Sequence, residues 1–340
     1  MNSVLVTGAN GHLGFALSAL LARRGYRVRA SVRNPGACAE QTRCLRELGV
    51  ELVVADLLDP VALARALAGC EGLFQVAAVY RTHARDPQRE IVEPSLVGGL
   101  NALRAAQAAG VRRVVFTSSI AALGSDAPPG RPLTELDWND NAVHPYFQAK
   151  TQAERQAWAF AREAGLDLVV INPGAIIGPG FYRHTPTTQP FEMMLRGQLP
   201  LAFPTGFTFV DVRDAAQAHL LAYESATAAG RYLAADRYFS MGELMAFARQ
   251  HFSGIPFPRR VLPVQLLSLA VLQDWLGGLV LGRPRVVTRA MARECGGRYQ
   301  RASSEKIRRE LGWQPMDFRQ SLADTFAWIR ERFIEGTGNR

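Results

Sequence analysis

In the first half of the chain, short apolar runs alternate with segments whose apolar residues recur at helical spacing. The runs are rich in β-branched residues and short enough to be strands that are buried on both faces. They cover residues 4–6, 28–32, 52–55, 73–77, 114–117 and 168–171. Strands that alternate with helices form βαβ units, and right-handed crossovers place the helices on both faces of the sheet. The pattern therefore predicts an α/β fold around a doubly wound parallel sheet.

The alternation of apolar runs and helical segments ends near residue 178. Glycine and proline become frequent there, beginning with Gly178-Pro179-Gly180. A strand-like run at residues 208–210 then leads into a helix predicted over residues 211–225. We therefore expect one domain over residues 1–177 and a smaller C-terminal lobe over residues 178–340. The chain is expected to return to the main sheet near residues 205–225.

The composition excludes several classes of protein. Hydrophobic residues make up 48% of the chain and charged residues 20%, so it is neither disordered nor a coiled coil. The net charge is +9, but the arginines are spread along the chain and no nucleic-acid-binding motif accompanies them. The cysteines lack CxxC spacing and the histidines lack HxxxH spacing, so we expect neither a disulfide framework nor a metal site. The start of the chain lacks the pattern of a signal peptide, which predicts a cytoplasmic protein.

The apolar stretch over residues 261–281 has about the length of a membrane span. Asp274 lies near its middle, where a carboxylate is costly in lipid, so we do not expect a transmembrane segment. A pair of helices that covers a hydrophobic pocket is the preferred interpretation. Peripheral contact with a membrane surface is the alternative, because arginines such as Arg259 and Arg260 flank the stretch.

A glycine-rich turn follows the first predicted strand and opens the first predicted helix. Its sequence, TGANGHLG over residues 7–14, has glycine at positions 8, 11 and 14. These glycines allow a tight turn and the close approach of a pyrophosphate, which the free N–H groups of the helix then face. The turn predicts a dinucleotide site of the Rossmann type. We assign its contacts to Gly8, Asn10, Gly11, His12, Leu13 and Gly14.

The end of the second predicted strand indicates which dinucleotide binds. Sites for NAD carry an acid about 20 residues after the first glycines, which binds the ribose 2′-hydroxyl. Here Arg33 occupies that position, and no Asp or Glu lies between Arg23 and Cys38. A guanidinium suits a 2′-phosphate, so we predict NADP(H). Asp56 after the third strand and the small residues after the fourth are further candidates, although a helix cap and ordinary strand packing explain them equally well.

Tyr146 and Lys150 form the most informative pair in the sequence, because they are four residues apart on a helix predicted over residues 146–164. This spacing places them on one face, one turn apart. An ammonium close to a phenol lowers the pKa of the phenol, so the tyrosine can exchange a proton near neutral pH. The fifth strand ends in Ser118-Ser119, where a hydroxyl can hold a substrate carbonyl. These groups meet at the carboxyl end of the sheet, where doubly wound folds bind ligands.

Together these motifs resemble the extended branch of the short-chain dehydrogenase/reductase superfamily, the NAD-dependent epimerase/dehydratase superfamily. Within it, the chain is similar to dihydroflavonol-reductase-like and steroid-dehydrogenase-like members. The signature is TGxxGxxG with a serine followed 27 residues later by YxxxK, and the likeness continues through FTSSIAALG, NPGAIIGP and RELGWQP. The resemblance implies that Ser119, Tyr146 and Lys150 are catalytic. It also implies cofactor contacts from Asp56, Leu57, Val76, Ala77, Ala78, Lys150, Pro173, Ala175 and Ile176.

The resemblance favours an NADP-dependent oxidoreductase that reduces a ketone or aldehyde, or oxidises the alcohol in reverse. Residues 1–177 then bind NADP(H), and residues 178–340 mainly bind the substrate. The active-site strand ends in Ser-Ser-Ile without the acid pair of sugar-nucleotide dehydratases, so carbonyl reduction is preferred over sugar chemistry. A sugar or sugar-nucleotide epimerase with tightly bound NAD is the alternative. A dinucleotide-binding regulator without turnover is a third hypothesis, against which the intact triad argues.

The segments expected around the pocket are residues 79–85, 180–190 and 261–281, with Phe181 and Tyr182 among their aromatic side chains and Phe191 directly after the second segment. Because these segments are aromatic and aliphatic, we expect a hydrophobic or aromatic small-molecule substrate.

One position of the glycine turn departs from the family pattern. His12 stands where Phe is usual, which we expect to change only packing beside the pyrophosphate. Asn101 is interpreted as a helix residue rather than a fourth catalytic residue. The resemblance also implies a possible homodimer, in which the long helices predicted over residues 96–109 and 146–164 form a four-helix contact.

Overall fold

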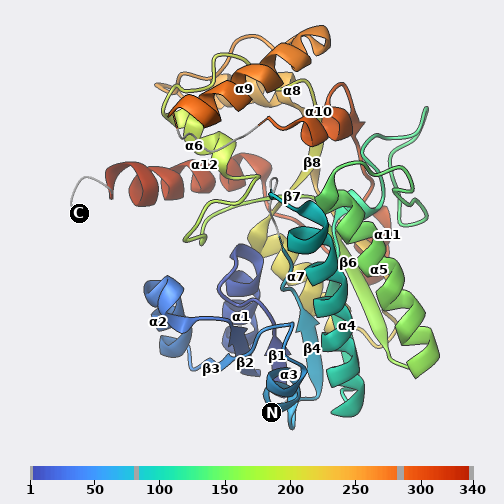
Figure 1. Cartoon of the computed structure of the whole chain (residues 1–340). Coiled ribbons are helices and arrows are strands. Elements are labelled where there is room, and N and C mark those ends of the chain that lie inside the picture. The colour runs from blue at the N-terminus through green and yellow to red at the C-terminus, as the bar shows by residue number, and fades with distance from the viewer. Residues whose placement is uncertain (1–2, 80–83, 282–286, 337–340) are drawn as a thin grey trace.

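The computed structural model describes residues 3–79, 84–281 and 287–336 (Figure 1). Its main sheet has seven parallel strands in the order β3-β2-β1-β4-β5-β6-β9. The strands are β1 (Ser3–Val6), β2 (Arg27–Val32), β3 (Glu51–Val54), β4 (Gly72–Gln75), β5 (Arg113–Thr117), β6 (Leu168–Pro173) and β9 (Gly230–Ala234). The strand order reverses between β1 and β4, as in a Rossmann-type fold. The predicted fold class is confirmed, and each of the six predicted runs overlaps a strand of this sheet.

Helices cover both faces of the main sheet, because successive residues of each strand point to opposite faces. Val4 and Val6 of β1 pack in one core, and Leu5 packs in the other. The first core includes residues of α1 (His12–Arg23), α2 (Ala39–Glu47), α7 (Val212–Glu224) and α11 (Glu305–Leu311). The second includes residues of α3 (Pro60–Leu67), α4 (Glu93–Ala108) and α5 (Pro145–Ala164).

The start of α5 is set by local sequence. His144 precedes the helix, and its Nδ1 accepts a hydrogen bond from the backbone N–H of Tyr146 at 3.2 Å. Pro145 occupies the first helical position, where its missing N–H is not needed. Tyr146 therefore lies in the first turn of α5, at the carboxyl end of the neighbouring strands.

The C-terminal lobe contains a second sheet, in which β8 (Gly206–Asp211) is central. β10 (Arg237–Ser240) pairs with β8 in antiparallel orientation, and β7 (Ala175–Ile177) and β11 (Tyr299–Gln300) pair with it in parallel. α6 (Gln189–Leu195), α8 (Met241–His251) and α12 (Phe318–Ile329) pack around a core rich in Phe and Leu. α9 (Leu267–Leu281) and α10 (Arg289–Cys295) complete this part of the molecule, where α9 lies at the outer edge (Figure 1).

The chain returns to the main sheet after the lobe has begun, but not as expected. Residues 205–225 hold β8, which belongs to the second sheet, and α7, which packs in the core of the main sheet. The strand that joins the main sheet is β9, which pairs with β6. A boundary at residue 177 stays a proposal, because residues on both sides of it build each of the two sheets.

The apolar stretch over residues 261–281 forms a short 3₁₀ turn, Val264–Leu266, followed by α9. Among the described residues, no helix is long and apolar enough to cross a membrane. Five apolar side chains of α9 are 45% or more exposed, so this helix does not turn its whole apolar surface toward a pocket as expected.

Candidate active site

The glycine-rich turn after β1 needs glycine for two reasons. Gly8 has a φ of +65°, and a Cβ atom there would lie 2.9 Å from Ala77 Cα. A Cβ on Gly14 would lie 2.2 Å from the Gly8 carbonyl oxygen. The turn is thus packed against both α1 and the segment after β4, as the sequence predicted for a dinucleotide cradle.

Thr7 ties the ends of β1 and β4 together. Its hydroxyl donates to Gln75 Oε1 at 2.6 Å and accepts from the N–H groups of Val76 and Ala77 at 2.9 and 3.0 Å. The segment Val76, Ala77 and Ala78 therefore lies directly beside the glycine turn, with Ala78 exposed. This is the position in which small residues allow a flat ligand to lie on the backbone.

The N-terminus of α1 is open to an anion. Gly11 precedes the helix without a side-chain cap, and the first turn carries no acidic residue. The first N–H groups of the helix and its positive dipole end therefore suit a pyrophosphate. Asn10 and His12 are half-buried at this turn, whereas the Leu13 side chain packs in the core, so only the backbone of Leu13 is available to a cofactor.

His12 does more than replace an aromatic ring. Its Nε2 lies 3.1 Å from the carbonyl oxygen of Pro179, and its ring meets Phe181 edge-on at 5.0 Å. Burial lowers the pKa of His12 to about 4, so the ring is neutral and Nε2 carries the proton that it donates to Pro179. Nδ1 is buried without a hydrogen-bond partner among the described residues. His12 therefore links the glycine turn to the lobe, which packing alone would not require.

Arg33 lies at the end of β2 and is exposed. The backbone N–H of Ala9 donates to the Ser31 carbonyl at 3.1 Å, which fixes the end of β2 beside the glycine turn. This places Arg33 on the same edge of the sheet as the open N-terminus of α1.

Asp56 and Leu57 form the turn after β3. Asp56 Oδ1 accepts from the backbone N–H of Leu58 at 2.9 Å, so the local-turn interpretation of this carboxylate is observed. The Leu57 carbonyl accepts from Asn101 Nδ2 at 3.0 Å. Asn101 therefore anchors the turn, in agreement with its interpretation as a helix residue rather than a catalytic one.

The paired serines after β5 have different partners. Ser118 Oγ is buried and donates to Glu154 Oε2 at 2.5 Å. Ser119 Oγ accepts from the backbone N–H of Ala121 at 3.1 Å, which leaves its own proton available to another acceptor. The geometry favours Ser119 over Ser118 as the serine that can hold a substrate oxygen.

Lys150 is 9% exposed, and its Nζ donates to the Thr117 carbonyl at 3.1 Å. Burial lowers the pKa of Lys150 to about 8, and the negative charge of Glu154 opposes this shift. The Thr117 hydroxyl lies 2.8 Å from Nε2 of His219, whose Nδ1 lies 2.7 Å from the Ala215 carbonyl. Burial also lowers the pKa of His219 to about 4, so this neutral ring donates to Ala215 and accepts from Thr117.

Tyr146 packs against an apolar cluster that contains Ala121, Phe147 and Cys295. Ala121 follows Ser119 by two residues, and Lys150 bonds to Thr117 two residues before Ser119. The structure therefore brings the predicted triad to the carboxyl end of β5. Cys295 belongs to α10, so the lobe also contacts this region.

A buried carboxylate that the sequence patterns did not single out lies one turn after Lys150. Glu154 is fully buried, and Asn172 Nδ2 donates to its Oε2 at 2.8 Å. Its Oε1 lies 2.5 Å from Nε of Arg231, which comes from β9 and stacks over Trp138 at 3.9 Å. Spacing at i, i+4 from Lys150 was a signal for Glu154, but its partner Arg231 is 77 residues away in sequence.

A second buried carboxylate comes from the lobe. Glu294 of α10 is fully buried, and its Oε2 accepts from the backbone N–H groups of Val143 and His144 at 2.6 and 2.7 Å. Its Oε1 accepts from the Ser125 hydroxyl and from Asn139 Nδ2. Glu294 therefore holds the residues immediately before α5. No sequence signal marked it, because all these partners are distant along the chain.

Pro173 ends β6, and Ala175 and Ile176 begin β7. These residues therefore lie at the connection between the main sheet and the second sheet. A Cβ at Gly174 would lie 2.3 Å from the Thr208 carbonyl, which shows how tightly the crossing is packed. Pro173 is buried, and Ala175 and Ile176 are half-buried beside the carboxyl end of β6.

The segments that were expected around the pocket lie only partly within the described residues. Residues 80–83 lie outside them. Phe181 and Phe191 are 1% and 3% exposed in the core of the lobe, so their placement as pocket walls is wrong. Tyr182 lies near Cys44 and under Arg332, whose guanidinium is 4.1 Å from the ring centre. These aromatic residues build the lobe rather than a surface for substrate.

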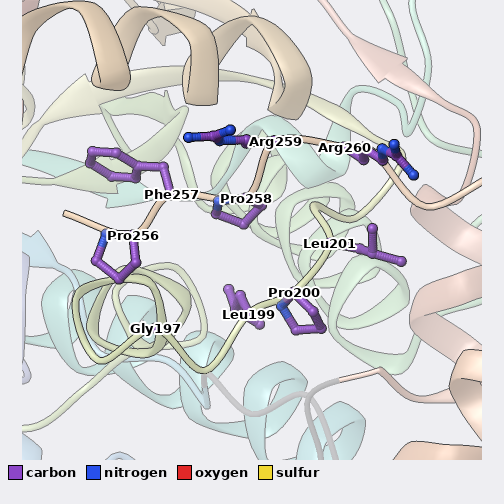
Figure 2. A pocket seen from close by; sticks show the side chains of 9 residues that line it. All are labelled: Gly197, Leu199, Pro200, Leu201, Pro256, Phe257, Pro258, Arg259 and Arg260. Carbon is purple, nitrogen blue, oxygen red and sulfur yellow. The ribbon is translucent and has the colours of Figure 1, made fainter.

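A separate pocket of about 370 Å³ lies in the lobe between residues 197–201 and 256–260 (Figure 2). Its walls are apolar except for Arg259 and Arg260. None of the predicted catalytic or cofactor residues lines it. It is therefore distinct from the site at the carboxyl end of β5.

The geometry described above agrees with comparisons to known proteins. Residues 4–235 match a family model described as the NAD dependent epimerase/dehydratase family. The chain belongs to this family. The resemblance drawn from the TGxxGxxG and YxxxK motifs is thereby confirmed.

Relatives within the family include two curated proteins. Cinnamoyl-CoA reductase CAD2 from Medicago truncatula is 34% identical over 76% of this chain and 83% of that protein. Sterol demethylase protein B from Methylococcus capsulatus is 33% identical over 97% of this chain and 99% of that protein. A solved structure of yeast methylglyoxal/isovaleraldehyde reductase Gre2 with NADPH superposes with a TM-score of 0.77 at 20% identity, over 98% of this chain and 99% of that one. This last likeness concerns the fold.

Proposed function

We propose that this family member is an NADPH-dependent carbonyl reductase in which Ser119, Tyr146 and Lys150 carry the proton chemistry. The observation that supports this most strongly is the burial of Lys150 at the end of β5. Lys150 lies one helical turn after Tyr146, and its Nζ donates to the neutral carbonyl of Thr117, which is two residues before Ser119. A buried ammonium in this position stabilises a phenolate and can bind a ribose hydroxyl.

The residues around the glycine turn fit NADP(H). The uncapped N-terminus of α1 suits the pyrophosphate. Exposed Arg33, without an acid nearby in the sequence, suits a 2′-phosphate. The yeast reductase of similar fold was solved with NADPH. Asp56, Leu57, Val76, Ala77 and Ala78 would line the rest of the dinucleotide, and Pro173, Ala175 and Ile176 would lie near the nicotinamide.

When bound, NADPH supplies a hydride for the carbonyl carbon. Tyr146 would donate the proton to the carbonyl oxygen, and Lys150 would lower the pKa of the Tyr146 phenol. Ser119 would hold the carbonyl oxygen, because its Oγ already accepts from Ala121 and so directs its own proton outward. The neutral His219 ring holds the Thr117 hydroxyl, which fixes the end of β5 beneath these groups.

For the substrate we propose a hydrophobic or aromatic ketone or aldehyde. The names of the two curated relatives refer to cinnamoyl-CoA, whose cinnamoyl group is aromatic, and to a sterol, which is largely apolar. The cytoplasm stays the proposed location, and a homodimer through α4 and α5 stays the proposed assembly.

The first test measures the cofactor. NADPH should raise the melting temperature more than NADH does, and Arg33→Gln should weaken NADPH binding about 10- to 100-fold while leaving NADH binding unchanged. Arg23→Gln, which removes another exposed arginine of the same domain, is the matched control. A larger shift with NADH, or equal losses in the two variants, would contradict the assignment of Arg33.

The second test measures the chemistry with a panel of hydrophobic ketones. Tyr146→Phe should lower NADPH-dependent kcat by about 100-fold or more and leave NADPH binding intact. Tyr299→Phe, at a tyrosine that is 41% exposed, is the control. Near-normal ketone reduction by Tyr146→Phe would contradict the proposed role of Tyr146 as proton donor. Purification with bound NAD(H) and no net turnover of external cofactor would instead support the epimerase alternative.

A further inference from the structure

The helix α9 is unusual because its outer side carries exposed apolar side chains. Leu269, Leu272, Leu276 and Leu279 are 62%, 50%, 45% and 70% exposed. Their spacing of three or four residues places them in one stripe along the helix. Asp274 lies on the inner side, where one of its carboxylate oxygens is shielded from solvent. Leu267 and Val271 are also buried on the inner side, so α9 is apolar on both sides, whereas a surface helix of a globular protein normally has a polar outer face.

The stripe is part of a larger exposed apolar surface. Trp275 is 47% exposed beside it. Val261, Val264 and Leu266, in the segment that leads into α9, are 41%, 47% and 43% exposed. We call these residues and the four leucines the α9 face. On α9, Ser268 and Gln273 are exposed among these apolar residues, but seven leucine and valine side chains and one tryptophan exposed over residues 261–279 favour an interaction site over scattered exposure.

Positive charge borders the α9 face. Arg259 and Arg260 are exposed and immediately precede Val261. Both line the pocket of Figure 2 together with Pro200 and Leu201, so guanidinium groups and apolar side chains share one surface. The outward residues of α9 include no acid.

We propose that the α9 face docks this protein on the surface of an anionic phospholipid membrane. The apolar stripe would enter the boundary between headgroups and acyl chains, and Arg259 and Arg260 would contact headgroup phosphates. Trp275 has the amphipathic ring that is enriched at this depth. The helix has 15 residues and is about 22 Å long, so it lies along the membrane rather than across it.

A second copy of the chain fits this face less well. Packing of α9 on α9 alone, over about 22 Å of length and 10 Å of width, would bury only roughly 400 to 500 Å² in total, so the residues before α9 and further contacts would have to supply most of the 1,200 Å² or more that a stable interface buries. A bilayer has no such requirement for area, because it accepts an apolar face of any shape. Anionic headgroups also complement the bordering arginines, which are charges that a self-association through α9 would leave unmatched.

The inner side of α9 connects the membrane face to the region of the catalytic helix. Leu267 is buried against Gly296, where a Cβ would lie 2.6 Å from Leu267 Cδ1. Gly296 directly follows α10, whose Glu294 holds the residues before α5. The membrane surface would thus lie on the lobe that contacts the Tyr146 region. The docking proposal itself does not depend on the proposed reductase activity.

Cosedimentation with vesicles tests the proposal. The full chain should bind vesicles of phosphatidylcholine mixed with phosphatidylglycerol, more weakly at high salt, and bind pure phosphatidylcholine less. Leu272→Glu/Leu276→Glu should abolish binding, and Arg259→Gln/Arg260→Gln should lower the partition coefficient about 10- to 30-fold. The Trp275 emission should shift to shorter wavelength with vesicles, and Trp275→Phe should remove that change.

Matched controls carry the same changes elsewhere. Val61→Glu/Leu136→Glu alters side chains that are 67% and 90% exposed, and Arg23→Gln/Arg24→Gln removes another exposed arginine pair. Melting temperatures confirm that each variant is folded. The proposal fails if the wild type does not bind anionic vesicles, or if the α9 variants bind as well as the controls. It also fails if Leu272→Glu/Leu276→Glu only converts a dimer to a monomer, since the face then covers a second copy.

Discussion

Two fully buried carboxylates, Glu154 within the proposed catalytic helix and Glu294 against the residues before it, are stabilised by different partners. Glu154 belongs to α5 itself and faces the sheet, where Arg231 of β9 supplies a positive charge at 2.5 Å. Glu294 comes from α10 in the lobe and accepts hydrogen bonds from the backbone of Val143 and His144. Among the described residues that bond to Glu294, none is a cation.

This difference indicates that one carboxylate chiefly stabilises the fold and the other chiefly positions the catalytic helix. A buried ion pair is expensive to break, because removing one partner leaves the other charge uncompensated in the core. Bonds from a carboxylate to backbone N–H groups cost less to lose, but they act directly on the backbone that they hold. We therefore expect Glu154 to matter chiefly for the stability of the sheet and Glu294 chiefly for the placement of Tyr146.

The largest effect is expected from breaking the ion pair. Glu154→Gln should lower the free energy of unfolding by about 3–5 kcal/mol, measured by urea denaturation, because Arg231 keeps its buried charge. Combining it with Arg231→Met should restore a large part of this loss. A loss in the double variant that equals the sum of the two single losses would show that the pair is not the cause.

A smaller loss of stability, with a clear effect on turnover, is expected at the second carboxylate. Glu294→Gln should cost about 1–3 kcal/mol, because an amide presents an N–H₂ group to donors that need an acceptor. We expect kcat to fall while the affinity for NADPH stays unchanged, since the cradle at α1 is remote from α10. Equal falls in kcat and in NADPH affinity would indicate general disruption instead.

The pH dependence of activity should separate the two carboxylates further. The Lys150 pKa is lowered to about 8, so its ammonium is lost as the pH rises through that value. We expect kcat/KM of the wild type to fall above pH about 8. Because the Glu154 charge raises the pKa of Lys150, Glu154→Gln should start this fall at lower pH, whereas Glu294→Gln should leave its position unchanged. A fall that shifts equally in both variants would rule out Lys150 as its source.

The smallest effect is expected from an exposed carboxylate on α5, the helix that also carries Glu154. Glu163 lies on α5 about two and a half turns after Glu154 and is exposed to solvent. Glu163→Gln should change the free energy of unfolding by less than about 0.5 kcal/mol and leave kcat unaltered. A larger change would mean that charge on α5 in general, rather than the buried site, controls stability.

The parts of the fold that the sequence predicted are those with strong local patterns. The six apolar runs became strands because buried parallel strands need continuous β-branched residues. β9 and the second sheet were not placed correctly, because short strands acquire their partners only through distant pairing, as when Gly230 aligns with Val169. Pairing of that kind leaves no periodic signal.

The candidate site shows the same division. Gly8, Tyr146 and Lys150 belong to motifs whose spacing itself requires a turn or a helical face. Arg231 and Glu294 are single residues whose roles depend on what they meet in the folded chain. Phe181 and Phe191 were misplaced because an aromatic residue in a pocket segment and one in a core have the same sequence signature.

The position of β9 has a consequence for the synthesis of this protein. β6 ends at Pro173, but the strand that covers its edge begins at Gly230, after the chain has built β7, β8 and α7. A ribosome must therefore add residues 174–229 while the edge of β6 remains unpaired. Open edges of this type recruit other strands and promote aggregation. We therefore expect the interval between the synthesis of these two strands to be a stage at which the nascent polypeptide is prone to aggregation.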